Sequence, residues 1–388
     1  MLRFLTAGES HGPALTVILE GLPAGLPLSE EAIDAQLRRR QKGYGSGGRM
    51  GIERDSVRLT GGVLKGHTTG APVAMEIQNR DWANWRDKEI LPMTVPRPGH
   101  ADLTGAIKYG YRELRLALER ASARETAART AAGAVCGRLL AEFGAAVGSY
   151  VVQIGRVSAA LPDGLPYADR FAQAKENDVR CPDPAAAEAM QECIREATAD
   201  GDTLGGVFEV FALGVPPGLG SFAHWDRRLD ARLMAAVGSI PAVKGVEVGP
   251  AFSNAARRGT QVHDEIFVED GQFTRRTNRA GGLEGGITTG QPVVVRAAMK
   301  PIATTLTPLR SVDLATGEAA ATRYERSDVC AVPRAAVVGE AMVAFVLADA
   351  LLEKVGGDSL AEMRPRFAAL RRGRLEELEM ENVRWRLG

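Results

Sequence analysis

The sequence predicts a mixed α/β fold of the α+β type, formed by a single domain that covers residues 1–388. Strand-like apolar runs and helical stretches both occur, but they do not alternate regularly as they do around a parallel sheet. Glycine-rich turns separate the strands, and two of these turns match each other. The sequence has no Gly-x-Gly-x-x-Gly motif after a strand and no Walker lysine motif, so neither a Rossmann nor a P-loop fold is expected.

The composition is that of an ordinary globular protein. Of 388 residues, 45% are hydrophobic and 25% are charged, and 48 basic residues balance 48 acidic ones, so net charge gives no attraction to nucleic acid. The four cysteines form no metal-type pair, which favours reduced thiols and a cytoplasmic location. The first motif begins at Gly8 and leaves no room for a signal peptide. The apolar stretch 335–352 contains Glu340 and Asp349, so it is expected to be a core helix and not a membrane span.

The first expected strand, residues 14–19, follows a glycine-flanked histidine. Residues 8–12 are Gly-Glu-Ser-His-Gly, and glycine lets the backbone turn sharply and approach a ligand. His100 follows a similar Arg-Pro-Gly turn, and the chain has only five histidines. We therefore expect acid–base chemistry at His11 and His100. The other three are expected to be structural or exposed, with His67 half-buried at a strand edge, and no histidine pair has metal-ligand spacing.

Two glycine-rich hairpins divide the chain into similar halves. Residues 61–73 (GGVLKGHTTGAPV) match residues 281–293 (GGLEGGITTGQPV), and each copy continues into a strand. A weaker match precedes each copy in the same order, at residues 21–37 and 214–233. We expect two halves, roughly 1–110 and 205–300, related by a pseudo-twofold axis; chance reuse of common turn residues is the alternative.

Helical sequence, residues 105–144, separates the halves. An amphipathic pattern predicts one helix over 105–118. Ser122 and Glu125 have the spacing of a capping box, which predicts an alanine-rich helix that runs to Phe143 and stops at Gly144. Further strands are expected at 150–154, 206–213, 246–248 and 293–297, and further helices at 183–199 and 334–354. The charged tail, 363–388, is expected to be a solvated helix without a site.

Arginines gather beside the glycine loops and at the start of the capped helix. Because a guanidinium binds carboxylates and phosphates through two parallel hydrogen bonds, Arg40, Arg49 and Arg97 predict a pocket for a polyanion. A solvated charged face is the alternative. Lys300 ends a strand and precedes hydroxyl residues, which is a weaker signal for a phosphate.

Seven segments, taken together and in order, closely resemble the chorismate synthase family and span residues 1–355. They are residues 8–12 (GESHG), 97–102 (RPGHAD), 120–126 (RASARET), 242–247 (AVKGVE), the hairpin 281–290, Lys300-Pro301 and 326–330 (RSDVC). The resemblance implies a single β-α-β sandwich domain with internal pseudo-symmetry, assembled as a homotetramer. It also implies a phosphate lyase that converts 5-enolpyruvylshikimate 3-phosphate to chorismate by 1,4-anti elimination, the last step of the shikimate pathway. The family requires reduced FMN although the reaction has no net redox change.

The same resemblance implies roles for individual residues. His11 matches the general acid near the departing phosphate, and His100 matches the histidine beside flavin N1. Asp328 matches an aspartate that helps to deprotonate flavin N5, which then accepts the C6 proton of the substrate. Flavin contacts are implied for Arg120, Ala121, Ser122, Pro241, Ala242, Gly285, Lys300, Pro301, Ile302, Ala303, Thr304 and Arg326. Substrate contacts are implied for Arg40, Arg49 and Arg97.

One position departs from the family pattern. Members of this type commonly have an arginine where this chain has Ser46, and that arginine and the equivalent of Arg40 are assigned to NADP(H). We therefore expect no NADPH site and dependence on an external source of reduced flavin. Two other classes of protein remain as alternatives. A non-catalytic RNA or polyanion binder is disfavoured by the zero net charge and by an aromatic content of 5%. An ordinary FMN oxidoreductase would change the redox state of its substrate.

Overall fold

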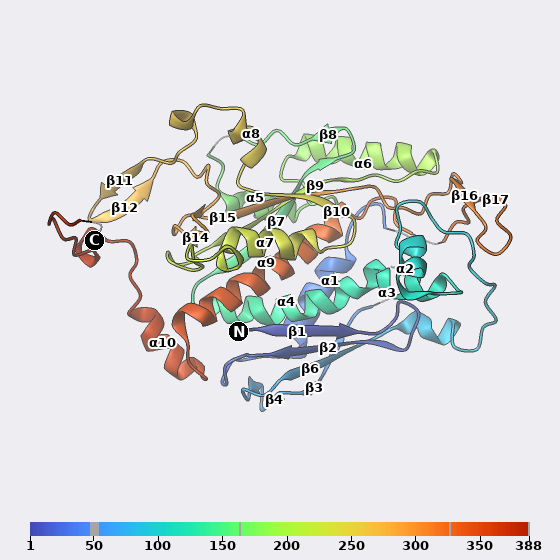
Figure 1. Cartoon of the computed structure of the whole chain (residues 1–388), viewed down its shortest axis with the longest axis horizontal. Helices are drawn as coiled ribbons and strands as arrows, with labels where there is room; N and C mark the ends of the chain where they lie inside the picture. The colour runs from blue at the N-terminus through green and yellow to red at the C-terminus, as the bar shows by residue number, and fades with distance from the viewer. Residues whose placement is uncertain (47–53, 163, 326, 387–388) are drawn as a thin grey trace.

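Two antiparallel sheets lie on either side of a layer of helices (Figure 1). The structure is a computed structural model that describes residues 1–46, 54–162, 164–325 and 327–386. The first sheet has the strand order β1 (Arg3–Ala7), β2 (Ala14–Glu20), β6 (Val73–Gln78) and β3 (Val57–Gly61). The second has the order β10 (Val243–Val248), β15 (Val293–Met299), β9 (Gly206–Leu213), β7 (Ala146–Ile154) and β8 (Val157–Ser158). The coarse expectation of an α+β chain is confirmed.

The central layer is formed by two long helices that pack against each other. Helix α4 (Thr126–Ala141) contacts the first sheet and helix α9 (Val332–Val355) contacts the second. Helix α1 (Glu30–Gln41) packs on α4, and α7 (Leu229–Gly238) packs on α9. Among the described helices, α9 is long and apolar enough to cross a membrane, but 83% of its most apolar window is buried inside the protein. It is the core helix that the sequence predicts.

The two matching hairpins have the same local hydrogen bonds. In the first, β4 (Val63–Leu64) pairs with β5 (His67–Thr68), and in the second, β13 (Leu283–Glu284) pairs with β14 (Ile287–Thr288). Thr68 Oγ1 accepts from the Leu26 amide at 2.9 Å and donates to the Pro23 carbonyl. Thr288 Oγ1 accepts from the Leu219 amide at 2.8 Å and donates to the Pro216 carbonyl. The matching sequence segments therefore make matching contacts. His67, expected to be half-buried, is exposed, and its Nδ1 lies 3.0 Å from the Lys65 carbonyl.

The segment between the halves departs from the expected single helix over 105–118. It forms α2 (Asp102–Tyr109) and α3 (Arg115–Ala121), because Gly110 adopts the left-handed conformation (φ 67°) and ends α2. Ser122 caps a short 3-10 turn, η3 (Ala123–Glu125), and not α4 itself: its Oγ accepts from the Arg124 amide. Helix α4 ends at Ala141.

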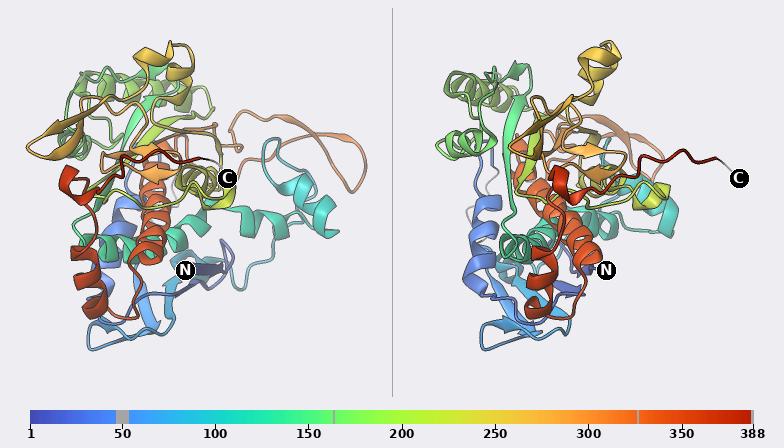
Figure 2. Two further views of the ribbon diagram at one scale, coloured as in Figure 1. Left: turned by 60° about the vertical axis from the view of Figure 1, so that its left-hand side comes forward. Right: turned by 90° about the vertical axis from the view of Figure 1, so that its left-hand side faces the viewer.

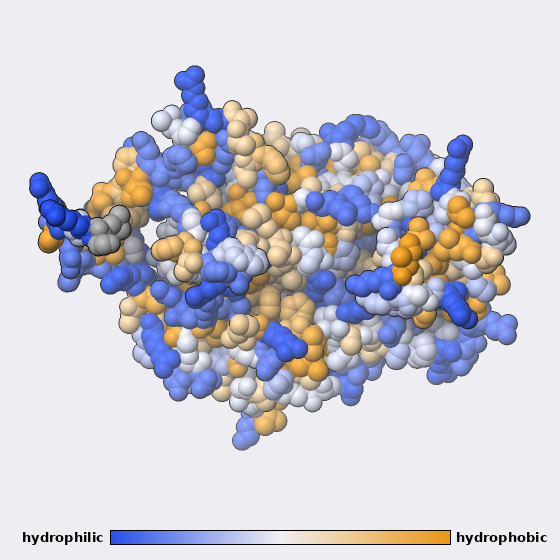
Figure 3. Space-filling view, in the orientation of Figure 1, coloured by the Kyte–Doolittle hydropathy of each residue, from blue (hydrophilic) through white to orange (hydrophobic). Residues whose placement is uncertain are grey.

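The remaining elements cover the edges of the layers. They are α5 (Tyr167–Ala174), α6 (Pro184–Ala199), α8 (Ala251–Ala255), α10 (Leu360–Ala368), the hairpins β11 (Ile266–Glu269)–β12 (Gln272–Arg275) and β16 (Arg310–Val312)–β17 (Ala319–Ala321), and the 3-10 turns η2 (Arg80–Asn84), η4 (Trp225–Arg227), η5 (Gly259–Gln261) and η6 (Leu375–Glu377). Figure 3 shows apolar side chains on the surface at both ends of this face of the molecule.

The expectation of a helical tail is wrong. After α10 the described tail has only η6 and then runs extended, away from the body of the protein in the right-hand view of Figure 2. Helix α10 covers only the start of this segment. Residues 372–375 pair instead with the β11–β12 turn: the Phe273 amide donates to the Gly373 carbonyl and the Leu375 amide donates to the Gly271 carbonyl, both at 2.8 Å. Residues 378–386 are exposed, and a short helix without packing is marginal in water.

The contact between the core helices gives a test of the fold. A Cβ atom at Gly133 would lie 2.3 Å from the Cα of Ala341 across the α4–α9 contact. We predict that Gly133→Ala lowers the free energy of unfolding by about 1–3 kcal/mol because the helices must separate, measured by urea denaturation. Gly137 lies one turn along α4 with open space around it. Gly137→Ala is expected to raise stability by about 0.5–1 kcal/mol. Equal effects at both positions would contradict the packing argument.

Candidate active site

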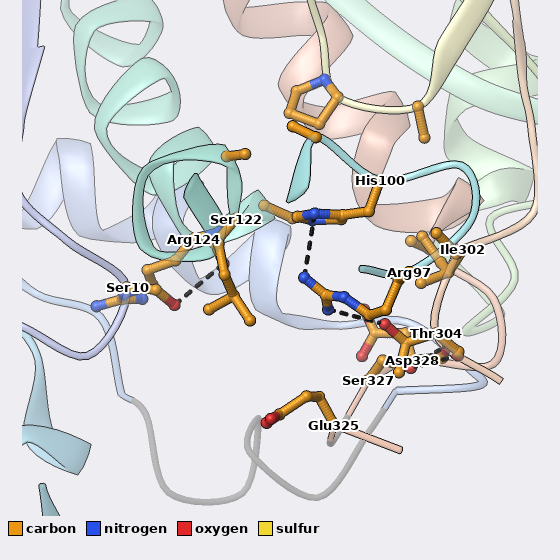
Figure 4. A pocket seen from close by; sticks show the side chains of 18 of the residues that line it. Ser10, Arg97, His100, Ser122, Arg124, Ile302, Thr304, Glu325, Ser327 and Asp328 are labelled. Atoms are coloured by element: carbon orange, nitrogen blue, oxygen red, sulfur yellow. Dashed lines mark hydrogen bonds between the residues drawn. The ribbon is translucent and has the colours of Figure 1, made fainter. Parts of the chain in front are cut away.

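A cavity of about 760 Å³ is lined by segments from most of the chain (Figure 4). The three residues expected to be catalytic all lie on its wall. His11 comes from the β1–β2 loop, His100 from the loop before α2, and Asp328 from the segment before α9. Residues Ser122 to Arg124, just before α4, and Ala331, just before α9, also line it. Both core helices therefore direct their N-terminal ends, where the helix dipole is positive, towards the cavity.

His11 is held by a half-buried carboxylate, Glu119. The backbone at Gly8 has φ 106°, and a Cβ there would lie 2.3 Å from the Ala14 carbonyl oxygen, so the turn requires glycine. The His11 amide donates to Glu119 Oε2 at 2.7 Å, and Nδ1 lies 2.8 Å from Oε1. Burial raises the pKa of Glu119, but the hydrogen bonds from His11 outweigh it and hold the pKa below its usual range. Because Nδ1 donates to the Glu119 carboxylate, Nε2 lies on the opposite side of the ring, away from Glu119.

The indole of Trp85 packs on the His11 ring, with the ring centroids 4.1 Å apart. Arg115 lies over the same indole and also 3.8 Å from Glu119 Oε1. The position of the His11 imidazole is therefore fixed from both its carboxylate side and its face.

His100 shares a second carboxylate with Arg97. Asp102 Oδ1 lies 2.6 Å from His100 Nδ1, and both carboxylate oxygens accept from the Arg97 guanidinium, at 2.8 and 3.0 Å. Arg97 Nη1 also donates to Thr304 Oγ1 at 3.1 Å (Figure 4). Burial raises the pKa of Asp102, but the hydrogen bonds from His100 and Arg97 outweigh it and keep the carboxyl ionised. Because His100 Nδ1 lies on Asp102, the Nε2 atom of His100 points away from that carboxylate.

A third buried carboxylate, Asp55, joins two more arginines of the wall. Arg124 Nη1 donates to Asp55 Oδ1 at 2.5 Å, and Arg40 Nη1 donates to Oδ2 at 3.3 Å. Arg40 Nη2 also donates to the Ala123 carbonyl at 3.0 Å, which connects the end of α1 to the turn before α4. One carboxylate between two guanidiniums leaves the local charge positive.

Small residues and a lysine form the rest of the expected flavin contacts. Ala121, Ser122, Pro241, Ala242, Ile302, Ala303 and Thr304 line the cavity. Ser122 Oγ donates to Ser10 Oγ at 3.0 Å, and Lys300 Nζ donates to the Gly99 carbonyl at 2.7 Å. Burial and the neighbouring Lys244 cation lower the pKa of Lys300. Ala242 has φ 67°, a strained conformation for alanine, and such strain is typical of functional sites.

Several expected site residues do not line this cavity. Arg120 points away and donates to the Thr6 carbonyl at 2.9 Å, and Pro301 is adjacent to lining residues without lining the cavity itself. Gly285 lies in the β13–β14 turn next to Phe222, and Ser46 Oγ donates to the Gly43 carbonyl. Arg49 and Arg326 lie outside the described residues.

Sequence reasoning missed several residues of the site. They are Asp55, Trp85, Lys88, Asp102, Glu119, Arg124 and Arg334. Two of them were indicated by their position in the sequence: Asp102 stands two residues after His100, and Glu119 directly precedes the 120–126 segment. Asp55 had no such indication, because its partners Arg40 and Arg124 are 15 and 69 residues away. Arg334 had none either, because it stands at the start of the predicted core helix 334–354 and carries no motif of its own. Among the described residues, no group of histidine, cysteine and carboxylate side chains could hold a metal ion.

The fold and the cavity define an acid–base enzyme for a polyanionic ligand. Among the described residues, six cationic side chains line the cavity, namely Arg40, Lys88, Arg97, Arg124, Lys300 and Arg334, against the carboxylates of Glu325 and Asp328. Residues 2–352 match the chorismate synthase family model. The chain belongs to the chorismate synthase family, whose members are lyases of the shikimate pathway and are known to use reduced flavin.

Relatives match nearly the whole chain. The chorismate synthase of Aquifex aeolicus is 55% identical over 383 residues, covering 94% of this chain and 96% of its own. That of Desulforudis audaxviator is 56% identical over 373 residues, covering 94% and 95%. A crystal structure of a chorismate synthase superposes with a TM-score of 0.78 at 48% identity, covering 95% of this chain and 96% of that one.

The Asp102 pair gives a test of the site's construction. Asp102 is fully buried, so Asp102→Asn leaves the Arg97 charge without its partner and should lower the free energy of unfolding by about 3 kcal/mol at neutral pH. The folded-state pKa lies below the ordinary value of 3.8. The wild-type advantage is therefore complete above pH 3.8 and shrinks as the pH falls below it.

Urea denaturation at several pH values measures this difference. Asp87 is an exposed aspartate that pairs with Arg86, and Asp87→Asn serves as the control that should leave the unfolding midpoint nearly unchanged. A loss in Asp102→Asn that is the same at every pH would contradict the assigned ionisation.

Proposed function

We propose that this cavity is where the chain performs the reaction of its family, conversion of 5-enolpyruvylshikimate 3-phosphate to chorismate and phosphate, with His11, His100 and Asp328 as the catalytic residues. One observation supports this most strongly: two imidazoles and a carboxylate from distant parts of the chain line a single cationic cavity. Each imidazole has its Nδ1 on a carboxylate, Glu119 for His11 and Asp102 for His100, so we assign proton transfer to the Nε2 atoms.

The charge of the cavity suits the substrate, which has two carboxylates and a phosphate. Arg40 and Arg97, with Arg49, are proposed to bind these groups. Both described arginines are held from behind by buried aspartates, so their geometry is set before the ligand arrives and little is lost in ordering them.

The residues of the wall also fit a flavin. A flat ring needs small side chains beside it, and Ala121, Ala242 and Ala303 provide them, while Lys300 provides a cation for a phosphate. These residues, with Arg120, Ser122, Pro241, Gly285, Pro301, Ile302, Thr304 and Arg326, are the proposed FMN contacts. When bound, reduced FMN supplies electron density and a basic ring nitrogen to the elimination, with no net redox change. A volume of about 760 Å³ lies within the range of about 300–1,000 Å³ that is usual for ligand sites.

The protein's own groups then act on the substrate. His11 delivers a proton from Nε2 to the departing phosphate while Glu119 holds Nδ1. Asp328 accepts a proton from the flavin side of the site, and His100 Nε2 holds a proton towards the flavin ring. The apolar side chains of Leu118, Met299 and Ile302 on the wall exclude water, which strengthens these interactions.

The proposal also covers the domain organisation, the oligomeric state, the cellular location and the source of reduced flavin. We infer a single domain with two halves related by a pseudo-twofold axis within a β-α-β sandwich, supported by the equivalent bonds of Thr68 and Thr288. The homotetramer is proposed from the family resemblance alone.

The four cysteines are free and buried, which supports a cytoplasmic location. Ser46 stands where members of the family commonly have an arginine, so we propose that NADPH does not bind and that reduced flavin comes from an external source.

Substitution tests the catalytic roles. We predict that His11→Ala and Asp328→Asn each slow turnover by about 10²-fold or more while FMN still binds. The measurement is phosphate release from 5-enolpyruvylshikimate 3-phosphate in an anaerobic assay with dithionite-reduced FMN. His224 is exposed and pairs only locally with Asp226, so His224→Ala is the control and should keep full activity. Full activity in either catalytic variant would refute the role given to that residue.

The source of reduced flavin is tested separately. With NADPH and oxidised FMN in air, the purified protein should show no turnover, because no NADPH site is proposed. Addition of a flavin reductase should restore activity. Turnover with NADPH and FMN alone would show that the protein reduces flavin itself.

A further inference from the structure

Arg334 lies on the cavity wall, but neither the sequence motifs nor the proposed contacts include it. It is the third residue of α9, beside the N-terminus of that core helix. Its side chain is buried, with 8% of the residue exposed, and it lines the cavity together with Ala331 and Asp328. Its Nη2 atom forms an ion pair with Asp328 Oδ2. The same Nη2 atom makes no hydrogen bond to the described part of the chain. The Asp328 carboxylate therefore balances a buried charge.

The surroundings of Arg334 are otherwise positive. Burial, with a smaller contribution from the Arg40 cation, lowers its pKa to about 9. The N-terminal end of α9 adds the positive end of a helix dipole. The aliphatic part of the side chain packs closely against Gly43, where an added Cβ would lie 3.3 Å from Arg334 Cγ. A buried guanidinium in such a place attracts any anion that enters the cavity, and its present partner is the carboxylate to which we assign catalysis.

We propose that Arg334 is an additional anion-binding residue of the active site, and that it holds Asp328 until a carboxylate or phosphate group of the substrate displaces that carboxylate. This inference rests on the proposed function. In the ligand-free protein Asp328 is engaged and cannot accept a proton efficiently. When the substrate anion binds Arg334, the Asp328 carboxylate is released towards the flavin side of the cavity. Substrate binding thus completes the site.

A simpler role is that Arg334 orients Asp328 permanently. The two roles predict different effects of the Asp328 charge on the affinity for an anion. If Asp328 and the ligand compete for one guanidinium, removing the aspartate charge must strengthen anion binding, and only while Arg334 is present. If Arg334 is a permanent partner, loss of Asp328 changes anion affinity only through the general charge of the cavity, with or without Arg334.

Inorganic phosphate is the probe, and its dissociation constant for the full-length protein is measured by isothermal titration calorimetry without flavin. The proteins are the wild type, Asp328→Asn, Arg334→Gln and the double variant. Glu325 is the matched control, because it is the other carboxylate of the cavity wall and lies 3.7 Å from Arg115. Glu325→Gln is made alone and with Arg334→Gln. If Arg334→Gln does not fold, Arg334→Met replaces it, since methionine keeps a long flexible side chain but removes the charge.

We expect Asp328→Asn to bind phosphate at least about threefold more tightly than the wild type, and Arg334→Gln to bind it at least about threefold more weakly. In the Arg334→Gln background the effect of Asp328→Asn should vanish, whereas that of Glu325→Gln should persist. An Asp328→Asn effect that survives the loss of Arg334, or no effect at all, would overturn the proposal. These titrations need no turnover, so a failure here is separate from a failure of phosphate release in the anaerobic assay.

Discussion

The cavity depends on three carboxylates that lie behind its wall, two of them buried and one, Glu119, half-buried. Asp55, Asp102 and Glu119 each accept hydrogen bonds from groups that face the ligand space. Without them, four or more cations and two imidazoles would be placed close together in a poorly solvated space, which costs more than the surrounding hydrogen bonds return. The carboxylates lower that cost and at the same time fix each guanidinium and ring. They leave the wall positive, because one carboxylate serves two cationic or basic groups.

The core of the fold sets where these groups meet. Helices α4 and α9 pack closely at Gly133 and Ala341, and both direct their N-terminal ends to the cavity. The loops that hold His11 and Lys300 come from different sheets, one on each side of this helix pair. A change in the spacing of the two helices would therefore shift both walls of the site. Local glycines add precision: at Gly8, no other residue fits against the Ala14 carbonyl.

Sequence patterns predicted elements whose cause is local. The alternation of β2, the apolar run of α9 and the paired hairpins were all visible, because turn residues and side-chain periodicity act over a few positions. The break between α2 and α3 was not predicted, because a glycine ends a helix only where it adopts the left-handed conformation, as Gly110 does (φ 67°). Nor was the extended tail, because charged residues with good helix propensity still need a packed face to stay helical. At the site, His11, His100 and Asp328 stood out through their motifs. Asp55 did not, because its function comes from Arg40 and Arg124, which are 15 and 69 residues away in the chain.

The carboxylates of the cavity differ in how they are held. Asp102 and Glu119 are bound by hydrogen bonds that lower their pKa values, so the imidazoles beside them are held in place. Asp328 pairs with Arg334, and this is the contact that we propose a substrate anion exchanges. The reaction of the family begins with three anionic groups on one molecule and ends with two on chorismate and one on free phosphate. Under the proposed roles, His11 is fixed while Asp328 can leave Arg334. This matches the order of events, since the phosphate needs a proton donor already in position, while the proton acceptor is needed only once the substrate has entered.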